Sequence, residues 1–178
     1  ATNSNQKTTE IAPKKTPNST KISSNNNGFC FSKSDKVADL GVGFSGYGIP
    51  IHLGGEYFFT DDLSGGLAIN YSRYSYSYLG YNAGTWNFVF GGPKVNYHFN
   101  RILNIKEPKA DLYAGATLGY WAGWYSDANF SGYGGYGNTV YIGLQVGGRY
   151  FFSNNIGAFA ELGGGNLSAA TLGLSLKF

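Results

Sequence analysis

Apolar side chains alternate with small or polar ones in short runs from about residue 37 to the end of the chain. Residues 171–178 show the pattern most clearly, with Leu172, Leu174, Leu176 and Phe178 at alternate positions. Successive side chains of a β-strand point to opposite faces, so this run has one apolar face and one small or polar face. We therefore expect strands that face hydrocarbon on one side and water on the other.

The alternating runs predict eight strands, separated by clusters of Gly, Asn, Asp and Pro. We expect them at about residues 37–46, 49–59, 63–79, 86–99, 110–125, 140–152, 156–163 and 167–178. Tight turns are expected at residues 60–62 and 153–155, and longer loops at residues 80–85 and 126–139. The fourth strand contains two apolar sets, Trp86, Phe88 and Phe90, then Val95, Tyr97 and Phe99. They are out of phase by one residue, which predicts a β-bulge at the intervening Gly-Gly-Pro of residues 91–93.

Composition decides how these strands can be used. Charged residues make up 13% of the chain, against about 25% in soluble domains, while Gly reaches 28 residues, Tyr 15 and Phe 13. No stretch approaches the roughly 18 consecutive apolar residues of a transmembrane helix. In hydrocarbon, only helices and closed barrels satisfy all backbone hydrogen-bonding groups. We therefore predict an all-β fold, an eight-stranded antiparallel transmembrane β-barrel formed by residues 36–178.

Residues 1–35 are rich in Asn, Ser, Thr, Lys and Pro and contain little that could be buried, so we expect a disordered tail. Cys30 is the single cysteine, which excludes an intramolecular disulfide, and we interpret it as a small apolar residue at the junction of tail and barrel. An even number of strands places both ends of the barrel on one side, so the tail and the C-terminus are expected to be periplasmic. No leader sequence is visible, and we assume that it was removed on export.

Residues 54–63 and 147–156 form a weak internal repeat, in which Gly-Gly-x-Tyr-Phe-Phe is followed by a turn. Aromatic residues of this kind sit at the headgroup level of membrane barrels, where an apolar ring and a polar edge are both accommodated. We therefore expect an aromatic girdle at each membrane interface. The girdle candidates are Tyr57, Phe59, Tyr150 and Phe152 at the inner interface and Trp86 and Trp124 at the outer one.

The chain ends with a glycine, a hydrophobic residue three positions later and a terminal aromatic, here Gly173, Leu176 and Phe178. This run resembles the C-terminal assembly signal of bacterial outer-membrane barrels. From residue 37 onward the chain resembles the small eight-stranded outer-membrane barrels such as outer membrane proteins A and X, and its repeated turns resemble the barrel domains of Bacteroidetes-type bacteria. The resemblance implies a place in the bacterial outer membrane and insertion by the barrel-assembly machinery, but it implies no one activity.

Charged residues gather on the predicted inward faces of the strands. The candidates for a polar lumen core are Asp39, His52, Glu56, Lys94, Arg149 and Glu161, with His98, Asp111 and Lys177 on the same faces. The interior of an eight-stranded barrel is only wide enough for side chains to fill it, so we expect these charges to be paired and the lumen to be plugged. A narrow channel is the alternative. A soluble lipocalin-like barrel is disfavoured, because its interior would be apolar.

Residue chemistry narrows the function further. Lipid-modifying barrels resemble one another in using a His with a Ser or an acid, and His52 with Ser45 and Glu56 is the corresponding candidate here. The spacing matches no nucleophile motif, so we expect no enzyme. Two separated His and one Cys predict no metal site, and nothing in the sequence requires a cofactor. No basic stripe is interleaved with aromatics, which disfavours nucleic acid as a partner.

These observations favour a non-enzymatic outer-membrane barrel that acts as an anchor, scaffold or accessory subunit of a larger complex. Its expected partners are outer-membrane lipid and other envelope proteins. A wall that packs against a protein should be flatter than one that faces lipid, because small residues let backbones approach. The candidate partner face consists of Ala114, Ala116, Ala158 and Ala160, on the fifth and seventh strands.

Overall fold

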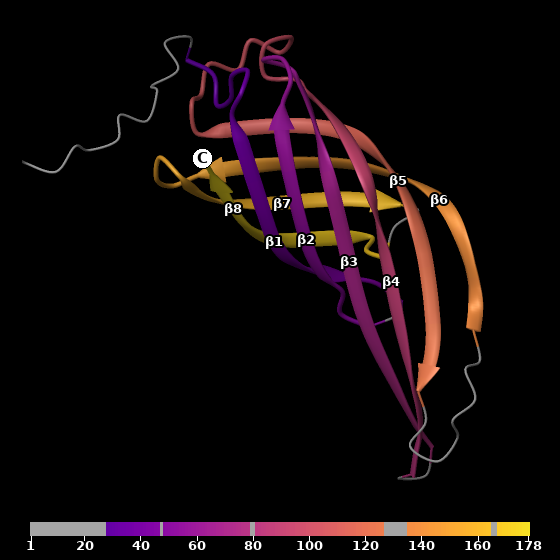
Figure 1. The fold of residues 1–178 in the computed structure, drawn as a ribbon. Helices are drawn as coiled ribbons and strands as arrows, with labels where there is room; N and C mark the ends of the chain where they lie inside the picture. Colours follow the sequence, from indigo (N-terminus) through magenta and orange to yellow (C-terminus); the bar gives the residue numbers. More distant parts are fainter. Residues whose placement is uncertain (1–27, 47, 79–80, 127–134, 165–166) are drawn as a thin grey trace, which may run out of the picture.

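A computed structural model describes residues 28–46, 48–78, 81–126, 135–164 and 167–178. These residues form a closed antiparallel barrel, in which each strand pairs with its neighbours along the chain and the last pairs with the first (Figure 1). The strands are β1 (Lys36–Phe44), β2 (Ile51–Phe58), β3 (Leu63–Tyr78), β4 (Tyr81–His98), β5 (Ala110–Ser126), β6 (Gly135–Phe151), β7 (Ile156–Gly164) and β8 (Ala170–Lys177). The predicted all-β, eight-stranded barrel is confirmed. No helix in the described ranges is long and apolar enough to cross a membrane.

The outer surface of the barrel is apolar and its interior is largely polar. On β1, the outward side chains of Leu40 and Val42 are 58% and 47% exposed, whereas the inward side chain of Asp39 is 1% exposed. The same alternation runs along β2, β7 and β8, as the period of two in a strand requires. Exposure of such an apolar surface to water is unfavourable, whereas its contact with hydrocarbon is favourable.

The two halves of the wall differ in length. The strands β3 to β6 contain 16 to 18 residues, whereas β1, β2, β7 and β8 contain 8 or 9. Pairing of β2 with β3 ends at Ile51 and Tyr71, and pairing of β6 with β7 ends at Leu144 and Gly164. Beyond these pairs the four long strands continue together as a half-wall (Figure 1). A bilayer crossing needs only about 9–11 residues, so the half-wall exceeds it.

The long strands correct two predicted loops. The loop expected at residues 80–85 contains the start of β4, and the loop expected at 126–139 contains the start of β6 at Gly135. We refer to the end of the barrel with Lys36 and Phe178 as the terminal end, because these two residues exchange backbone hydrogen bonds there. The last residues of β3 and β5 and the first residues of β4 and β6 lie at the opposite, far end (Figure 1).

The predicted β-bulge at residues 91–93 is wrong. Pairing of β3 with β4 continues without a shift through Ile69 with Gly91 and Leu67 with Pro93. Register shifts occur instead near the far end, at Tyr76/Ser77 and Trp121/Gly123. The apparent change of phase arises because Phe88 and Phe90 point inward, not toward lipid. An aromatic ring is apolar on either face, so alternation alone does not assign its direction.

Inward-facing glycines make room for large rings in this narrow interior. A Cβ added to Gly119 would lie 2.2 Å from the Phe90 ring, and one added to Gly147 would lie 2.5 Å from the Tyr113 ring. Both rings belong to buried side chains. The lumen of an eight-stranded barrel has space for a limited side-chain volume, and glycine opposite aromatic residues meets that limit.

Candidate functional site in the barrel lumen

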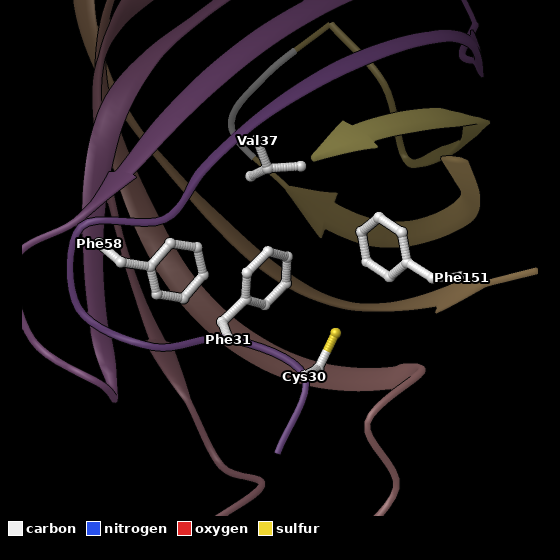
Figure 2. Packing of buried hydrophobic residues seen from close by; sticks show 5 residues of the cluster. All are labelled: Cys30, Phe31, Val37, Phe58 and Phe151. Carbon is white, nitrogen blue, oxygen red and sulfur yellow. The ribbon is translucent and has the colours of Figure 1, made fainter. Parts of the chain in front are cut away.

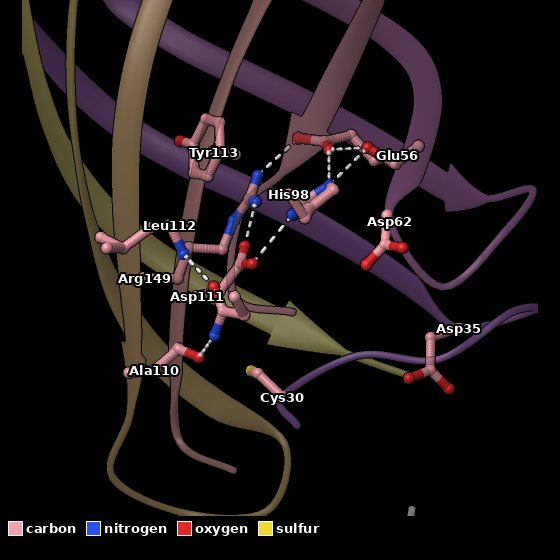
Figure 3. Close-up of polar contacts among 12 residues, drawn as sticks. Cys30, Asp35, Glu56, Asp62, His98, Ala110, Asp111, Leu112, Tyr113 and Arg149 are labelled. Carbon is pink, nitrogen blue, oxygen red and sulfur yellow. Dashed lines mark hydrogen bonds and ion pairs between the residues drawn. The ribbon is translucent and has the colours of Figure 1, made fainter. Parts of the chain in front are cut away.

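Arg149 on β6 lies at the centre of a buried charge cluster. Its guanidinium donates to Asp111 Oδ2 on β5 at 3.2 Å and pairs with Glu56 on β2 (Figure 3). It also donates to Asp39 Oδ2 on β1 at 2.7 Å. All four side chains are buried. Planar guanidinium groups present several donors in a fixed geometry, which suits contact with more than one carboxylate. One side chain therefore links strands on different sides of the lumen.

Two residues of β4 complete the cluster. Lys94 Nζ lies 2.8 Å from Glu56 Oε1, and His98 Nδ1 lies 2.8 Å from Asp111 Oδ1. His98 Nε2 lies 2.9 Å from the hydroxyl of Ser64, which donates to Glu56 at 2.6 Å. We define the charge cluster as Asp39, Glu56, Lys94, His98, Asp111 and Arg149. A buried charge is tolerated when it is paired and hydrogen-bonded, and each carboxylate here has both kinds of contact.

The surroundings of the cluster supply further hydrogen bonds. The Tyr113 ring lies 4.2 Å from the Arg149 guanidinium carbon, and its hydroxyl donates to Glu161 Oε2 at 3.1 Å. Ser175 on β8 donates to Asp39 at 2.5 Å. The structure therefore buries Glu161 beside the cluster, reached through Tyr113.

His52 lies apart from this cluster. Its Nδ1 is 3.0 Å from Asn70 Oδ1, and its ring is 5.8 Å from the Phe159 ring. Its Nε2 has no hydrogen-bond partner among the described residues. Ser45, the candidate neighbour, donates to the Gly48 carbonyl at 3.3 Å. His52 thus contacts an amide and an aromatic ring, and the candidate grouping with Ser45 and Glu56 is not formed by these contacts.

Residues 28–35, which we call the plug, pack into the terminal end of the lumen. Phe31 is 3% exposed and stacks on Phe58 with ring centroids 4.3 Å apart, and it meets Phe151 edge-on at 5.6 Å (Figure 2). Lys177 Nζ lies 4.6 Å from the centre of the same ring. The assignment of residues 1–35 to a disordered tail is therefore corrected for the plug, and residues 1–27 lie outside the described ranges.

The plug closes over the charge cluster. The His98 ring lies 4.4 Å from the Phe58 ring and 6.0 Å from the Phe31 ring. His98 therefore belongs to the charge cluster and also lies beside the plug. We call the residues around Phe31 the socket: Phe58, His98, Phe151 and Lys177. Burial in this region, reinforced by the negative charge of Asp111, raises the pKa of the Cys30 thiol from 9.0 to about 12. The thiol therefore stays protonated at neutral pH, which suppresses its reactivity.

The socket reveals a third copy of the aromatic repeat. Tyr57-Phe58-Phe59 and Tyr150-Phe151-Phe152 each place their central ring inside the barrel, and Tyr97-His98-Phe99 on β4 does the same with a histidine. This copy is hard to detect in the sequence, because its centre is His and the Gly-Gly pair does not stand directly before it. Tyr-x-Phe at the ends of β2, β4 and β6 is the signal that could have found it.

The outer rings of the repeat face outward at the terminal end. Tyr57 and Phe59 lie edge to face with centroids 5.5 Å apart, and Tyr97 and Phe99 lie likewise at 5.2 Å. The other predicted residues of this girdle, Tyr150 and Phe152, are exposed. An outward band of Tyr and Phe is typical of the headgroup level of a membrane.

Aromatic side chains pack together inside the far end of the barrel. Phe88 and Phe90 are buried with Leu167, and Trp86 and Trp121 pack against them. We call these five residues the aromatic cap. Trp86 stacks on Phe88 with centroids 6.3 Å apart, so its assignment to an outward girdle is corrected. The physical reason is the same as for Phe88: the inner side of the wall is apolar at this end, so an aromatic ring can point inward.

The remaining candidates lie on the outer surface or in the barrel seam. Trp124, Leu176 and Phe178 are exposed. Gly173 faces inward, where a Cβ would lie 2.2 Å from the Leu40 carbonyl oxygen. Ala158 and Ala160 on β7 are exposed, and Ala114 and Ala116 on β5 are half-buried. The alanines of the candidate partner face lie on both sides of β6, since Ala114 pairs with Val146 and Ala158 with Tyr150.

No protein-family model and no curated protein matches the chain. Solved structures do match it. The N-terminal β-barrel domain of Pseudomonas aeruginosa OprF has a TM-score of 0.57 at 20% identity, covering 83% of this chain and 100% of that one. A de novo designed transmembrane β-barrel has a TM-score of 0.52 at 18% identity, covering 83% and 98%. Ail, the attachment invasion locus protein of Yersinia pestis, has a TM-score of 0.50 at 15% identity, covering 82% and 99%. At such low identity, the likeness establishes that this chain shares the fold of small membrane β-barrels.

Proposed function

We propose that the chain is an outer-membrane barrel with a closed lumen that acts, without enzymatic activity, as an anchor, scaffold or accessory subunit of a larger envelope complex. The observation that carries this proposal is the closure of the lumen at two levels. The charge cluster and plug fill the terminal end, and the aromatic cap fills the far end. A barrel that is filled in this way offers its outer wall and its half-wall, rather than a pore, for contact with other molecules.

Several features support the location. The apolar outer surface, the outward band of Tyr and Phe and the terminal Gly173, Leu176 and Phe178 fit a bacterial outer membrane and insertion by the barrel-assembly machinery. In this proposal the terminal end, with the plug and Phe178, faces the periplasm, and the half-wall faces outward. The repeat of Gly-Gly-x-Tyr-Phe-Phe supports a further proposal, that the chain is one of the Bacteroidetes-type barrels.

The partner face of the proposed complex is the wall of β5 to β7 with Ala114 and Ala116. The test replaces both alanines with Trp, and the matched control replaces Leu67 with Trp, an outward residue of β3 that lies outside this wall and is 62% exposed. Native membranes are extracted in mild detergent, and the mass and composition of the particles are measured. We expect the wild type and the control to travel in a large stoichiometric assembly and the double variant to travel alone. A wild-type particle near the 19.1 kDa of one chain plus detergent would overturn the subunit proposal.

Closure of the lumen has its own test. Planar bilayers that contain the purified barrel should show no discrete conductance steps at moderate voltage, because charged and aromatic side chains fill both ends. A filled lumen does not support regular single-channel steps. Such steps would favour the channel alternative.

A further inference from the structure

The first half of the plug is held to the barrel by side chains. Phe31 occupies the socket, Lys177 donates to the Cys30 carbonyl, and the Arg101 guanidinium lies 4.5 Å from the centre of the Phe29 ring. The second half is held by the backbone: Ser34 N donates to the Phe58 carbonyl at 2.9 Å, Phe58 N donates to the Asp35 carbonyl at 3.0 Å, and Lys33 N donates to Asp61 Oδ1 at 2.8 Å. These contacts are local, whereas each strand is bonded along its length.

Lys177 contacts the plug at three places. Its ammonium group lies 3.1 Å from Asp35 Oδ2, donates to the Cys30 carbonyl and lies over the Phe31 ring. The ion pair with Asp35 is partly exposed, with side-chain exposures of 15% and 20%. Lys177 on β8 therefore contacts the plug on both sides of Ser34, at Cys30 and Phe31 before it and at Asp35 after it.

The backbone permits the plug to move as a unit. Ser34 has a φ of 75°, a left-handed conformation that is unusual for a residue other than glycine. The first pair of β1 with β2 is Lys36 with Tyr57, two residues further along. Rotation about Ser34 therefore changes the position of residues 28–33 and leaves every strand pair of the barrel in place.

We propose that the plug is a displaceable closure of the terminal end: it swings about Ser34 out of the socket, and the barrel remains intact when it does so. Its departure exposes the rings of Phe58 and Phe151 and admits water to the charge cluster. The device is independent of whether the barrel belongs to a larger complex.

Cys30 is a native reporter of plug position. It is buried beside Phe31, and it is the single cysteine of the chain, so a water-soluble maleimide reacts at one site. The experiment follows the labelling rate of the full chain in lipid vesicles at neutral pH, and gel mobility without heating checks that the barrel stays folded. We expect slow labelling of the wild type at denaturant concentrations well below those that unfold the barrel. Labelling of Lys177→Gln and Phe31→Ala should be at least tenfold faster.

The matched control is Lys36→Gln, which removes a charge from an exposed side chain at the same end, in the first position of β1. It should label at the wild-type rate. The proposal is overturned if Lys177→Gln, with its barrel folded, labels at the wild-type rate, or if wild-type labelling requires the denaturant concentration that unfolds the barrel. If Phe31→Ala does not fold, Lys177→Gln decides the matter alone.

Hydrogen exchange gives a second, independent measurement. Plug release breaks the bond from Ser34 N to Phe58 O but not those of β2 with β3. The Ser34 amide should therefore exchange much faster than the amide of Leu53, which lies within β2. Equal protection of the two amides would show that the plug opens only with the whole barrel and would overturn the proposal.

Discussion

The two ends of the lumen are closed by different means. At the terminal end, Arg149 is held among three carboxylates and a separate segment of chain is laid over them. At the far end, rings from β4 and β5 meet Leu167, and the closure belongs to the wall and its connection. A charged closure depends on each partner being present, because a lone buried charge is costly, whereas an aromatic closure depends on volume. One barrel is thus filled by charge pairing at one end and by apolar packing at the other.

The largest effect should follow from removing the central cation. Arg149→Met leaves Asp39, Glu56 and Asp111 facing one another without the guanidinium, and the free energy of unfolding should fall by about 3–5 kcal/mol. Urea unfolding in lipid vesicles, followed by gel mobility, measures it. Arg101→Met is the control, because its partners Asp61 and Asp62 are partly exposed, and it should cost about 1 kcal/mol or less. Equal losses in the two variants would show that the charge cluster is not the main closure.

The aromatic cap should respond to lost volume. Phe90→Ala removes a fully buried ring, and the free energy of unfolding should fall by about 3 kcal/mol. Phe90→Leu retains most of the apolar volume and should cost about 1 kcal/mol. The same vesicle assay measures both. If alanine and leucine are equally tolerated, the far end is not closed by packing.

Overpacking tests the same end from the opposite direction. Gly119→Ala places a methyl group 2.2 Å from the Phe90 ring, so the ring must move, at a cost of about 1–3 kcal/mol. Combination with Phe90→Leu should recover part of the loss, because the smaller side chain frees the space. Strictly additive losses in the double variant would contradict a direct contact between these two positions.

The smallest expected effect concerns alkaline pH. The pKa of Cys30 is raised by burial to about 12 in the folded chain, from 9.0. A raised pKa contributes stability below pH 9 that is lost as the pH rises from 9 to 12, because the unfolded thiol ionises first. Between pH 8 and pH 10 the wild type should lose about 1 kcal/mol more than Cys30→Ala. Parallel pH profiles for the two proteins would show that the thiol is not buried by the plug.

The sequence predicts the barrel well, because the alternation of apolar and polar side chains along many strands indicates which side chains face lipid. It also places Asp39, Glu56, Lys94 and Arg149 inside, since a charge has one acceptable side in such a wall. It fails for Trp86, Phe88 and Phe90, because rings are apolar wherever they point and only the neighbours inside the far end decide their direction. The plug escapes prediction for another reason: Phe31 belongs to a three-residue apolar run, residues 29–31, that follows a long polar stretch, and its socket is assembled from four distant strands.

The contact of Lys177 with the Cys30 carbonyl joins residues that are 147 positions apart in the chain. This contact makes the burial of the plug depend on both ends of the chain. The socket takes its walls from β2, β4 and β6, and its lysine from β8, which closes the barrel by pairing with β1. The full set of plug contacts therefore exists only when β8 is paired with β1. The accessibility of a single thiol near the start of the chain thus reports on whether the last strand is in place.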